Sequence, residues 1–161
     1  MTQEEFLRIY HAYYNTVYRL ALAALKNVPD AEDVVQNVFA KLLDARIAPQ
    51  PGKERQWLVK VTVNACRDLM RASWWRKQES LDENIPFSQP EDSAVFYAVM
   101  GLPDKYRLVI HLHYYEGYTC REIAGLLKIS PSAVSMRLTR ARNMLKSRLE
   151  DEDERLVSKD L

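Results

Sequence analysis

Residues 119–145, TCREIAGLLKISPSAVSMRLTRARNML, contain two helix starts separated by a short turn. Thr119 is followed three residues later by Glu122, which is the pattern of a capping box at a helix N-terminus. Ser130 and Pro131 mark the second start, because serine caps helices well and proline fits the first helical position. A short helix, a turn at Lys128-Ile129 and a longer helix form the helix-turn-helix pattern.

The longer helix has one apolar side and one polar side. Its apolar residues recur at i, i+4, i+7, i+11 and i+15, which predicts a buried stripe of Val134, Leu138, Ala141, Leu145 and Leu149. The opposite face carries Ser132, Ser135, Met136, Thr139, Arg140, Asn143 and Lys146, with Arg137 and Arg142 on its flanks. Small hydroxyl side chains allow close entry into the major groove, and arginine can meet guanine edges or phosphates. We therefore expect this face to bind DNA.

The charge distribution supports the same interpretation. The 161 residues include 23 Lys and Arg against 22 Asp and Glu, for a formal net charge of +1. Nevertheless, no acidic residue occurs from Ser130 to Leu149, and an acidic run then begins at Glu150. Because phosphates repel carboxylates, a DNA-binding face should lack them, although solvated helices are often basic too.

The N-terminal half predicts three more helices. The first has a capping box at Thr2 and Glu5 and ends at the break around Asn27 and Pro29. The second is expected to be capped by Asp30, with a buried face of Val34, Val35, Val38, Phe39, Leu42 and Leu43. The third should run from about Glu54 to Trp75, with an apolar side of Trp57, Leu58, Val61, Ala65, Leu69 and Ala72.

A polar stripe runs along the third predicted helix. Lys60, Asn64, Arg67 and Arg71 stand at i, i+4, i+7 and i+11, so they share one side. The pattern fits either a solvated face or a binding surface.

The middle of the chain predicts a boundary between two modules. Helical periodicity is lost from 76 to 90, which predicts a flexible linker. A short helix with Val95, Phe96, Val99 and Met100 should follow, and then one that starts at Leu102-Pro103-Asp104 and closes at Gly117. Four glycines in the whole chain and few alternating runs favour helices over sheets.

The predicted fold is therefore all-α, with two small helical domains joined by a flexible linker. The expected boundaries are 1–76 for the first domain, 77–92 for the linker, 93–150 for the second domain and 151–161 for a frayed acidic tail.

The sequence lacks the residue patterns that several classes of function require. Cys66 and Cys120 stand alone, so we expect reduced thiols, and His111 and His113 do not share a helix face for a metal. No Gly-rich phosphate loop or nucleophile constellation occurs, which predicts no enzyme activity, no metal and no cofactor. The first residues do not form a secretory signal, and the longest apolar stretch is interrupted by Arg19. We expect no membrane insertion and a cytoplasmic location.

Two blocks of sequence resemble a known family. LPDKYRLVIHLHYYEGYTCREIAGLLKISPSAVSMRLTRARNML, residues 102–145, resembles region 4 of bacterial sigma factors. DAEDVVQNVFAKLL, residues 30–43, and WLVKVTVNACRDLMR, residues 57–71, resemble region 2 of the same family. The two-region layout without a middle domain is similar to the extracytoplasmic-function group, known as ECF or group IV.

The resemblance implies a role for each block. It implies that Asp33, Gln36 and Phe39 dock on the β′ coiled-coil of core RNA polymerase, and that the second domain meets the β flap. For the −10 element it implies Lys60, Asn64, Arg67 and Arg71, with Asn64 beside a pocket for a flipped base and residues 45–56 assisting. For the −35 element it implies Ser132, Ser135, Met136, Arg137, Thr139, Arg140 and Asn143. An anti-sigma factor is the implied regulatory partner.

Three positions depart from the family pattern. Asn37 replaces the usual acidic residue after the glutamine, Lys128 replaces a common turn glycine, and Ser135 replaces a frequent basic residue. The alternative function is a helix-turn-helix regulator that binds DNA by itself as a dimer. That alternative gives no function to the DAEDVVQNVF segment or to the basic third helix.

Overall fold

The structure is a computed structural model that describes the backbone of residues 1–44, 46–72 and 93–159. Within these ranges every regular element is a helix, so the all-α prediction is confirmed. The chain divides into two compact units, Met1–Glu83 and Asn84–Leu161. The predicted linker at 77–92 lies outside the described residues.

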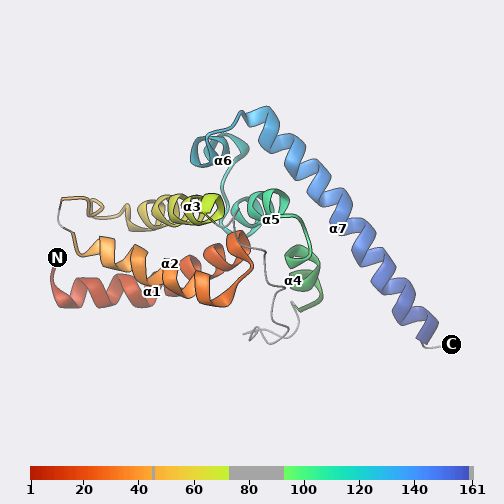
Figure 1. Cartoon of the computed structure of the whole chain (residues 1–161), viewed down its shortest axis with the longest axis horizontal. Helices are drawn as coiled ribbons and strands as arrows, with labels where there is room; N and C mark the ends of the chain where they lie inside the picture. Colours follow the sequence, from red (N-terminus) through yellow and green to blue (C-terminus); the bar gives the residue numbers. More distant parts are fainter. Residues whose placement is uncertain (45, 73–92, 160–161) are drawn as a thin grey trace. The chain divides into compact units, whose positions relative to one another are not determined.

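The first unit contains three helices (Figure 1): α1 (Gln3–Leu25), α2 (Val28–Leu42) and α3 (Glu54–Ala72). Each of them packs against the other two. The core is aliphatic and includes Ile9, Val17, Leu20, Val34, Val38, Leu42, Leu58 and Val63. The burial of these apolar side chains away from water is the main contribution that holds α2 and α3 against α1.

The helix starts follow local chemistry, with one correction. The capping box at Thr2 is present, since Thr2 Oγ1 accepts from the backbone N–H of Glu5 at 3.1 Å. The cap of α2 is Asn27, and the prediction of Asp30 is wrong: Asn27 Oδ1 accepts from the N–H of Asp30 at 2.9 Å. Pro29 fits the first turn because its missing N–H would have no helical partner there.

The buried side of α3 also differs from the prediction. The buried residues are Leu58, Val59, Thr62, Val63 and Cys66, whereas Trp57, Val61, Ala65 and Leu69 are half-buried and Ala72 is exposed. Thr62 is polar and is not part of the predicted apolar side. Its hydroxyl donates to Leu58 O at 2.6 Å, and this bond allows the side chain to be buried in the core. In α2 the expected face is buried except for Leu43, which is 62% exposed. The predicted end of α3 at Trp75 lies outside the described residues.

The second unit begins with α4 (Ser93–Met100) and α5 (Asp104–Ile110), which continues as a π-helical turn, η3 (His111–Tyr115). Gly117 then reverses the chain at a φ of 78°. The helices α6 (Cys120–Leu127) and α7 (Pro131–Lys159) follow, and α7 packs against α4, α5 and α6. The core of this unit includes Leu102, Leu108, Val109, Leu112, Ile123, Leu127, Val134 and Leu138.

The last helix extends into the acidic segment after Glu150, which is predicted to be frayed, and α7 continues to Lys159. No glycine or proline occurs after Pro131, so nothing in the local sequence ends the helix earlier.

Candidate nucleic-acid and polymerase interfaces

The starts of α6 and α7 are capped by bonds that the sequence predicts. Thr119 Oγ1 accepts from the N–H of Glu122 at 3.2 Å, and the Glu122 carboxylate accepts from the N–H of Thr119 at 3.1 Å. Ser130 Oγ accepts from the N–H of Ala133 at 3.1 Å and caps α7. Lys128 adopts the left-handed conformation at a φ of 57°, so the turn keeps the backbone of a glycine while it carries a lysine.

The outer face of α7 lies where the sequence predicts it. Val134, Leu138 and Ala141 are buried, and Leu145 and Leu149 are half-buried. On the opposite side, Met136 is 53% exposed and Arg137 is half-buried. The remaining predicted −35 residues are exposed: Ser132, Ser135, Thr139, Arg140 and Asn143. These side chains form a surface that can enter a major groove.

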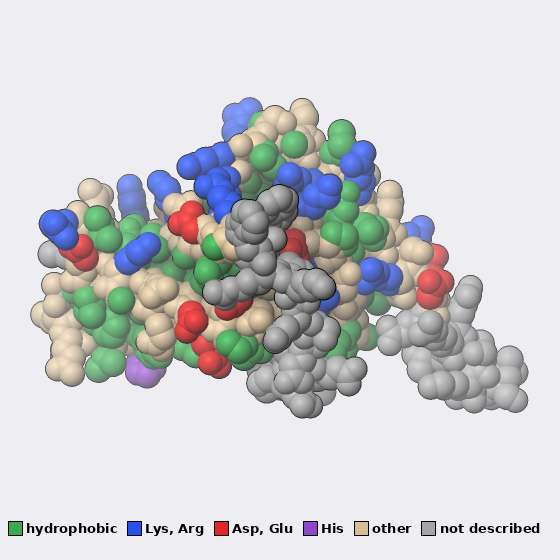
Figure 2. All heavy atoms as spheres, viewed as in Figure 1, with side chains coloured by type: hydrophobic (Ala, Val, Ile, Leu, Met, Phe, Trp, Pro, Cys, Tyr) green, Lys and Arg blue, Asp and Glu red, His purple; other side chains and the backbone are tan. Residues whose placement is uncertain are grey.

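This surface of the second unit is basic. Figure 2 shows Lys and Arg side chains along α6 and α7, with acidic side chains on α7 only near the end of its described part. The first of them in sequence is Glu150. A surface of one charge sign raises the local concentration of a polyanion.

The predicted −10 residues lie on one side of α3 in the first unit. Lys60, Asn64 and Arg71 are exposed, and Arg67 is half-buried. The stripe lies about 100° around the helix from the buried Val59, Val63 and Cys66, because Lys60, Asn64 and Arg67 each follow one of them directly. The α2–α3 connection, which was expected to assist them, turns at Gly52 with a φ of 86°.

The predicted polymerase residues of α2 fall into two groups. Asp33 and Gln36 are exposed and face away from the bundle. Phe39 is only 3% exposed, and its ring lies 4.9 Å from that of Tyr10 and 6.5 Å from that of Phe6. Phe39 therefore packs α2 against α1.

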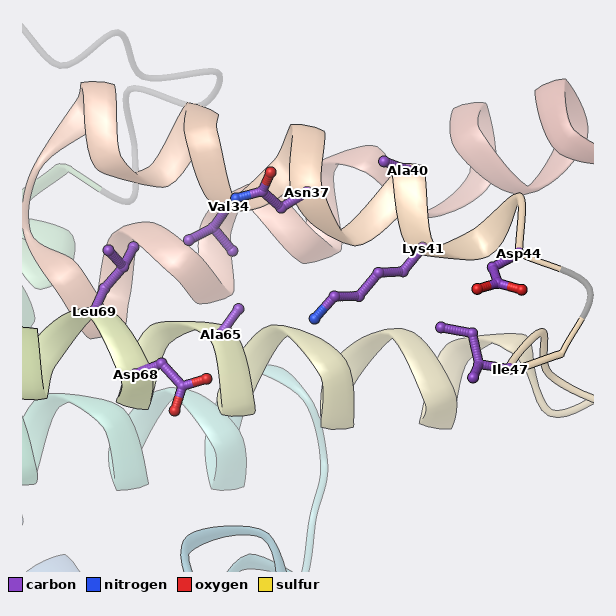
Figure 3. Close-up of a pocket in the computed structure, with 9 residues that line it drawn as sticks. All are labelled: Val34, Asn37, Ala40, Lys41, Asp44, Ile47, Ala65, Asp68 and Leu69. Carbon is purple, nitrogen blue, oxygen red and sulfur yellow. The ribbon is translucent and has the colours of Figure 1, made fainter.

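A groove lies between α2 and α3 and was not predicted. It has a volume of about 580 Å³. In Figure 3, Lys41 extends from α2 toward α3, where Ala65 and Asp68 stand. The other lining residues are Val34, Asn37, Ala40, Asp44, Ile47 and Leu69. Asn37, one of the departures from the family pattern, thus stands at the rim of this groove.

The sequence also did not indicate a buried polar pair beside the helix-turn-helix. His111 Nε2 lies 3.1 Å from the carboxylate of Glu116, and both side chains are less than 10% exposed. The π-helical turn makes this contact possible because Glu116 N–H reaches back to His111 O at 3.1 Å. An i, i+5 pair has no counterpart in ordinary helical spacing, so the periodicity could not reveal it.

The two cysteines have different surroundings. Cys66 is buried in the first unit, and burial raises the pKa of its thiol to about 12. Cys120 is partly exposed at the start of α6. No helix in the described part of the chain is long and apolar enough to cross a bilayer.

Comparison with known proteins identifies the family. Residues 9–76 match Sigma-70 region 2, and residues 94–145 match Sigma-70 region 4. The RNA polymerase sigma factor SigV of Bacillus subtilis is 30% identical over 147 residues, which are 84% of this chain and 86% of SigV. The chain belongs to the sigma-70 family. Further relatives place this sigma-70 family member in the ECF group, as its sequence predicts.

Two of those relatives are longer proteins. The ECF RNA polymerase sigma factor SigE of Mycolicibacterium smegmatis is 29% identical over 146 residues, which are 83% of this chain and 57% of SigE. The probable RNA polymerase sigma factor RfaY of Xanthomonas campestris is 32% identical over 164 residues, which are 91% of this chain and 41% of RfaY. The chain thus spans about half the length of these two relatives.

Solved structures show the same fold. The sigma factor RpoE from Bartonella quintana, solved with the anti-sigma factor NepR, aligns with a TM-score of 0.68 at 21% identity and covers 92% of this chain and 96% of that one. CnrH, solved with the cytosolic domain of CnrY, aligns with a TM-score of 0.61 at 26% identity and covers 93% of this chain and 90% of that one.

Proposed function

We propose that this chain is an alternative sigma factor, which binds core RNA polymerase and directs promoter-specific transcription initiation. In this proposal residues 1–76 bind polymerase and the −10 element, residues 93–150 bind the −35 element, and residues 151–161 form an acidic tail. RNA polymerase and the chromosome share the cytoplasm, so the chain acts there. A sigma factor needs no catalytic group of its own, and we assign no catalytic residue to this chain.

The observation that carries the proposal is the presence of both sigma blocks in one chain, region 2 at 9–76 and region 4 at 94–145. A regulator that binds DNA by itself needs only the helix-turn-helix. The exposed Asp33 and Gln36 on α2 suit a protein partner, because Phe39 anchors that helix from inside. We assign the β′ coiled-coil of core polymerase to this face and the β flap to the second unit.

The exposed stripe on α3 suits a melted −10 element. Extruding a base from the stack costs a few kcal/mol, so cations and a receptive polar group must offset that cost. Lys60, Arg67 and Arg71 supply the cations, and Asn64 supplies both a donor and an acceptor. Ser132, Ser135, Met136, Arg137, Thr139, Arg140 and Asn143 are assigned to the −35 element.

A regulatory protein is the second part of the proposal. CnrH, at 26% identity, is bound to another protein, the cytosolic domain of CnrY. We propose that an anti-sigma factor likewise covers the polymerase and DNA faces of this chain. Purification of the chain from its own uninduced cells should recover such a protein in stoichiometric amount. Recovery of polymerase subunits alone would argue against it.

Run-off transcription with core polymerase over genomic fragments tests the main proposal. We expect discrete transcripts that require the chain, and their start sites return the promoter sequence. The Gln36→Ala variant should lose them in proportion to its weaker binding to core polymerase. Tight binding of a palindromic operator by the chain alone, with no effect on polymerase, would instead establish the dimeric regulator.

A further inference from the structure

Arg142 of α7 rests on a tyrosine from a different helix. Its Nε donates to the Tyr114 hydroxyl, and its guanidinium carbon lies 5.6 Å from the centroid of the Tyr114 ring. Tyr114 belongs to η3 and is 55% exposed, so the pair lies at the surface. Arginine over an aromatic face is attracted by the ring and is held in one orientation.

Arg140 also interacts with a tyrosine, at the start of α5. The Arg140 guanidinium lowers the pKa of the Tyr106 phenol, and Lys105 contributes to the same shift. The Lys105 ammonium lies 5.1 Å from the centroid of the Tyr106 ring. Arg140 of α7 and Lys105 of α5 thus both interact with the Tyr106 side chain.

The two arginines point to opposite edges of the DNA face. They are two residues apart on α7, and each residue turns an α-helix by about 100°, so their directions differ by about 200°. Between them lie the exposed Ser135, Met136 and Thr139.

The chemistry of these supports suits phosphate. A guanidinium has five N–H donors, and a tyrosine that accepts one of them leaves the others for a phosphate oxygen. Because the guanidinium is already oriented, less side-chain freedom is lost when DNA binds. When a helix lies in the major groove, the two sugar–phosphate backbones line its opposite edges.

We propose that Arg140 and Arg142 grip phosphates of opposite strands at the edges of the −35 groove, and that Tyr106 and Tyr114 are their positioning residues. Lys105 strengthens the Arg140 side. This inference rests on the proposed function. It adds Arg142, Lys105 and the two tyrosines to the predicted −35 residues, and it assigns Arg140 to the backbone and not to a base.

The test uses the full chain assembled with core polymerase and a promoter fragment found by run-off transcription. Single methylphosphonate groups, which carry no charge, replace each phosphate around the −35 element in turn. For the wild-type chain we expect one sensitive phosphate on each strand, where neutralisation weakens binding about tenfold. Arg142→Ala should bind more weakly and become insensitive at one of these phosphates only. Arg140→Ala should become insensitive at the other.

The tyrosines are tested with variants that keep the ring. Tyr114→Phe removes the acceptor of Arg142, so sensitivity at the Arg142 phosphate should fall from about tenfold to about threefold. Tyr106→Phe should do the same at the Arg140 phosphate. Tyr115→Phe is the matched control, because Tyr115 is 53% exposed but stacks on His111 within its own segment, and both sensitivities should persist.

Two results would overturn the inference while the proposed function stands. One is wild-type promoter binding that no single methylphosphonate weakens. The other is an Arg140→Ala variant that relaxes the base preference and keeps both phosphate sensitivities. A wild-type assembly with core polymerase that binds no promoter overturns the proposed function itself, together with the inference.

Discussion

The Arg107 guanidinium donates to the Asp104 carboxylate at 2.7 Å, although only 1% of the Arg107 side chain is exposed. A second bond runs from Arg107 Nη1 to Leu102 O at 2.9 Å. Burial lowers the pKa of Arg107, and Asp104 opposes that shift. These bonds tie the turn between α4 and α5 to the helix that supports α7, so Arg107 is a structural residue.

Replacement of Arg107 by methionine should destabilise the second unit. The apolar chain refills the volume, but Leu102 O loses its donor, which costs about 1–3 kcal/mol. Urea unfolding followed by far-UV circular dichroism should show this loss. The sequence of the second unit, Asn84–Leu161, contains no tryptophan, so tryptophan fluorescence serves as an internal control and should not shift. An unchanged circular dichroism transition would contradict the structural role.

Phe39 and Gln36 should separate folding from binding on the same helix. Phe39→Ala opens a cavity between α1 and α2 and should cost about 3–5 kcal/mol of the stability of the first unit. Gln36→Ala alters an exposed side chain and should change stability by less than about 0.5 kcal/mol. Tryptophan fluorescence in urea measures both effects.

Binding to core polymerase gives the complementary result. We expect Gln36→Ala to weaken it directly, while Phe39→Ala weakens it only under conditions in which the first unit unfolds. A Phe39→Ala chain that is fully stable yet fails to bind would show that its ring contacts the partner.

Asn64→Ala should impair promoter opening more than polymerase binding. The exposed amide is assigned to the flipped base, and it takes no part in the bundle core. Permanganate footprinting of unpaired thymines measures opening, and co-elution with core polymerase measures binding. Asn15→Ala, which removes an exposed amide from α1 outside the predicted −10 residues, is the matched control. Equal loss in both assays would indicate a misfolded first unit.

Lys128→Gly should stabilise the second unit. A side chain at a φ of 57° costs about 1 kcal/mol that glycine does not pay, partly offset by the greater freedom of glycine in the unfolded chain. Circular dichroism in urea should therefore give a midpoint equal to or above the wild type. Lys128→Ala keeps the steric cost and is the matched comparison. A clear loss in the glycine variant would mean that the lysine side chain supports the turn.

The two thiols should differ in alkylation rate. The raised pKa of Cys66, about 12, keeps its thiol protonated at pH 8–9, and burial excludes the reagent. Iodoacetamide should modify Cys120 first and should reach Cys66 only in urea. Mass spectrometry of tryptic peptides distinguishes the two sites. Early modification of Cys66 in the native chain would show that the first unit opens readily.

The sequence by itself determined three of the helix starts. The caps at Thr2, Thr119 and Ser130 involve partners three residues away, so short-range spacing contains all the information they need. The exposed face of α7 was predictable for a related reason, since a long helix with one regular apolar stripe has only one side left for solvent. The family motifs likewise lie in continuous segments.

Tertiary structure decided which side of α3 is buried, why Arg107 enters the core, and where the groove beside Asn37 opens. It also decided that Tyr106 and Tyr114 support arginines 34 and 28 residues further along the chain. These features depend on where a second helix lies against the first. A periodic sequence pattern shows that a helix has an apolar side. Which residues pack against that side depends on segments that are distant in the sequence.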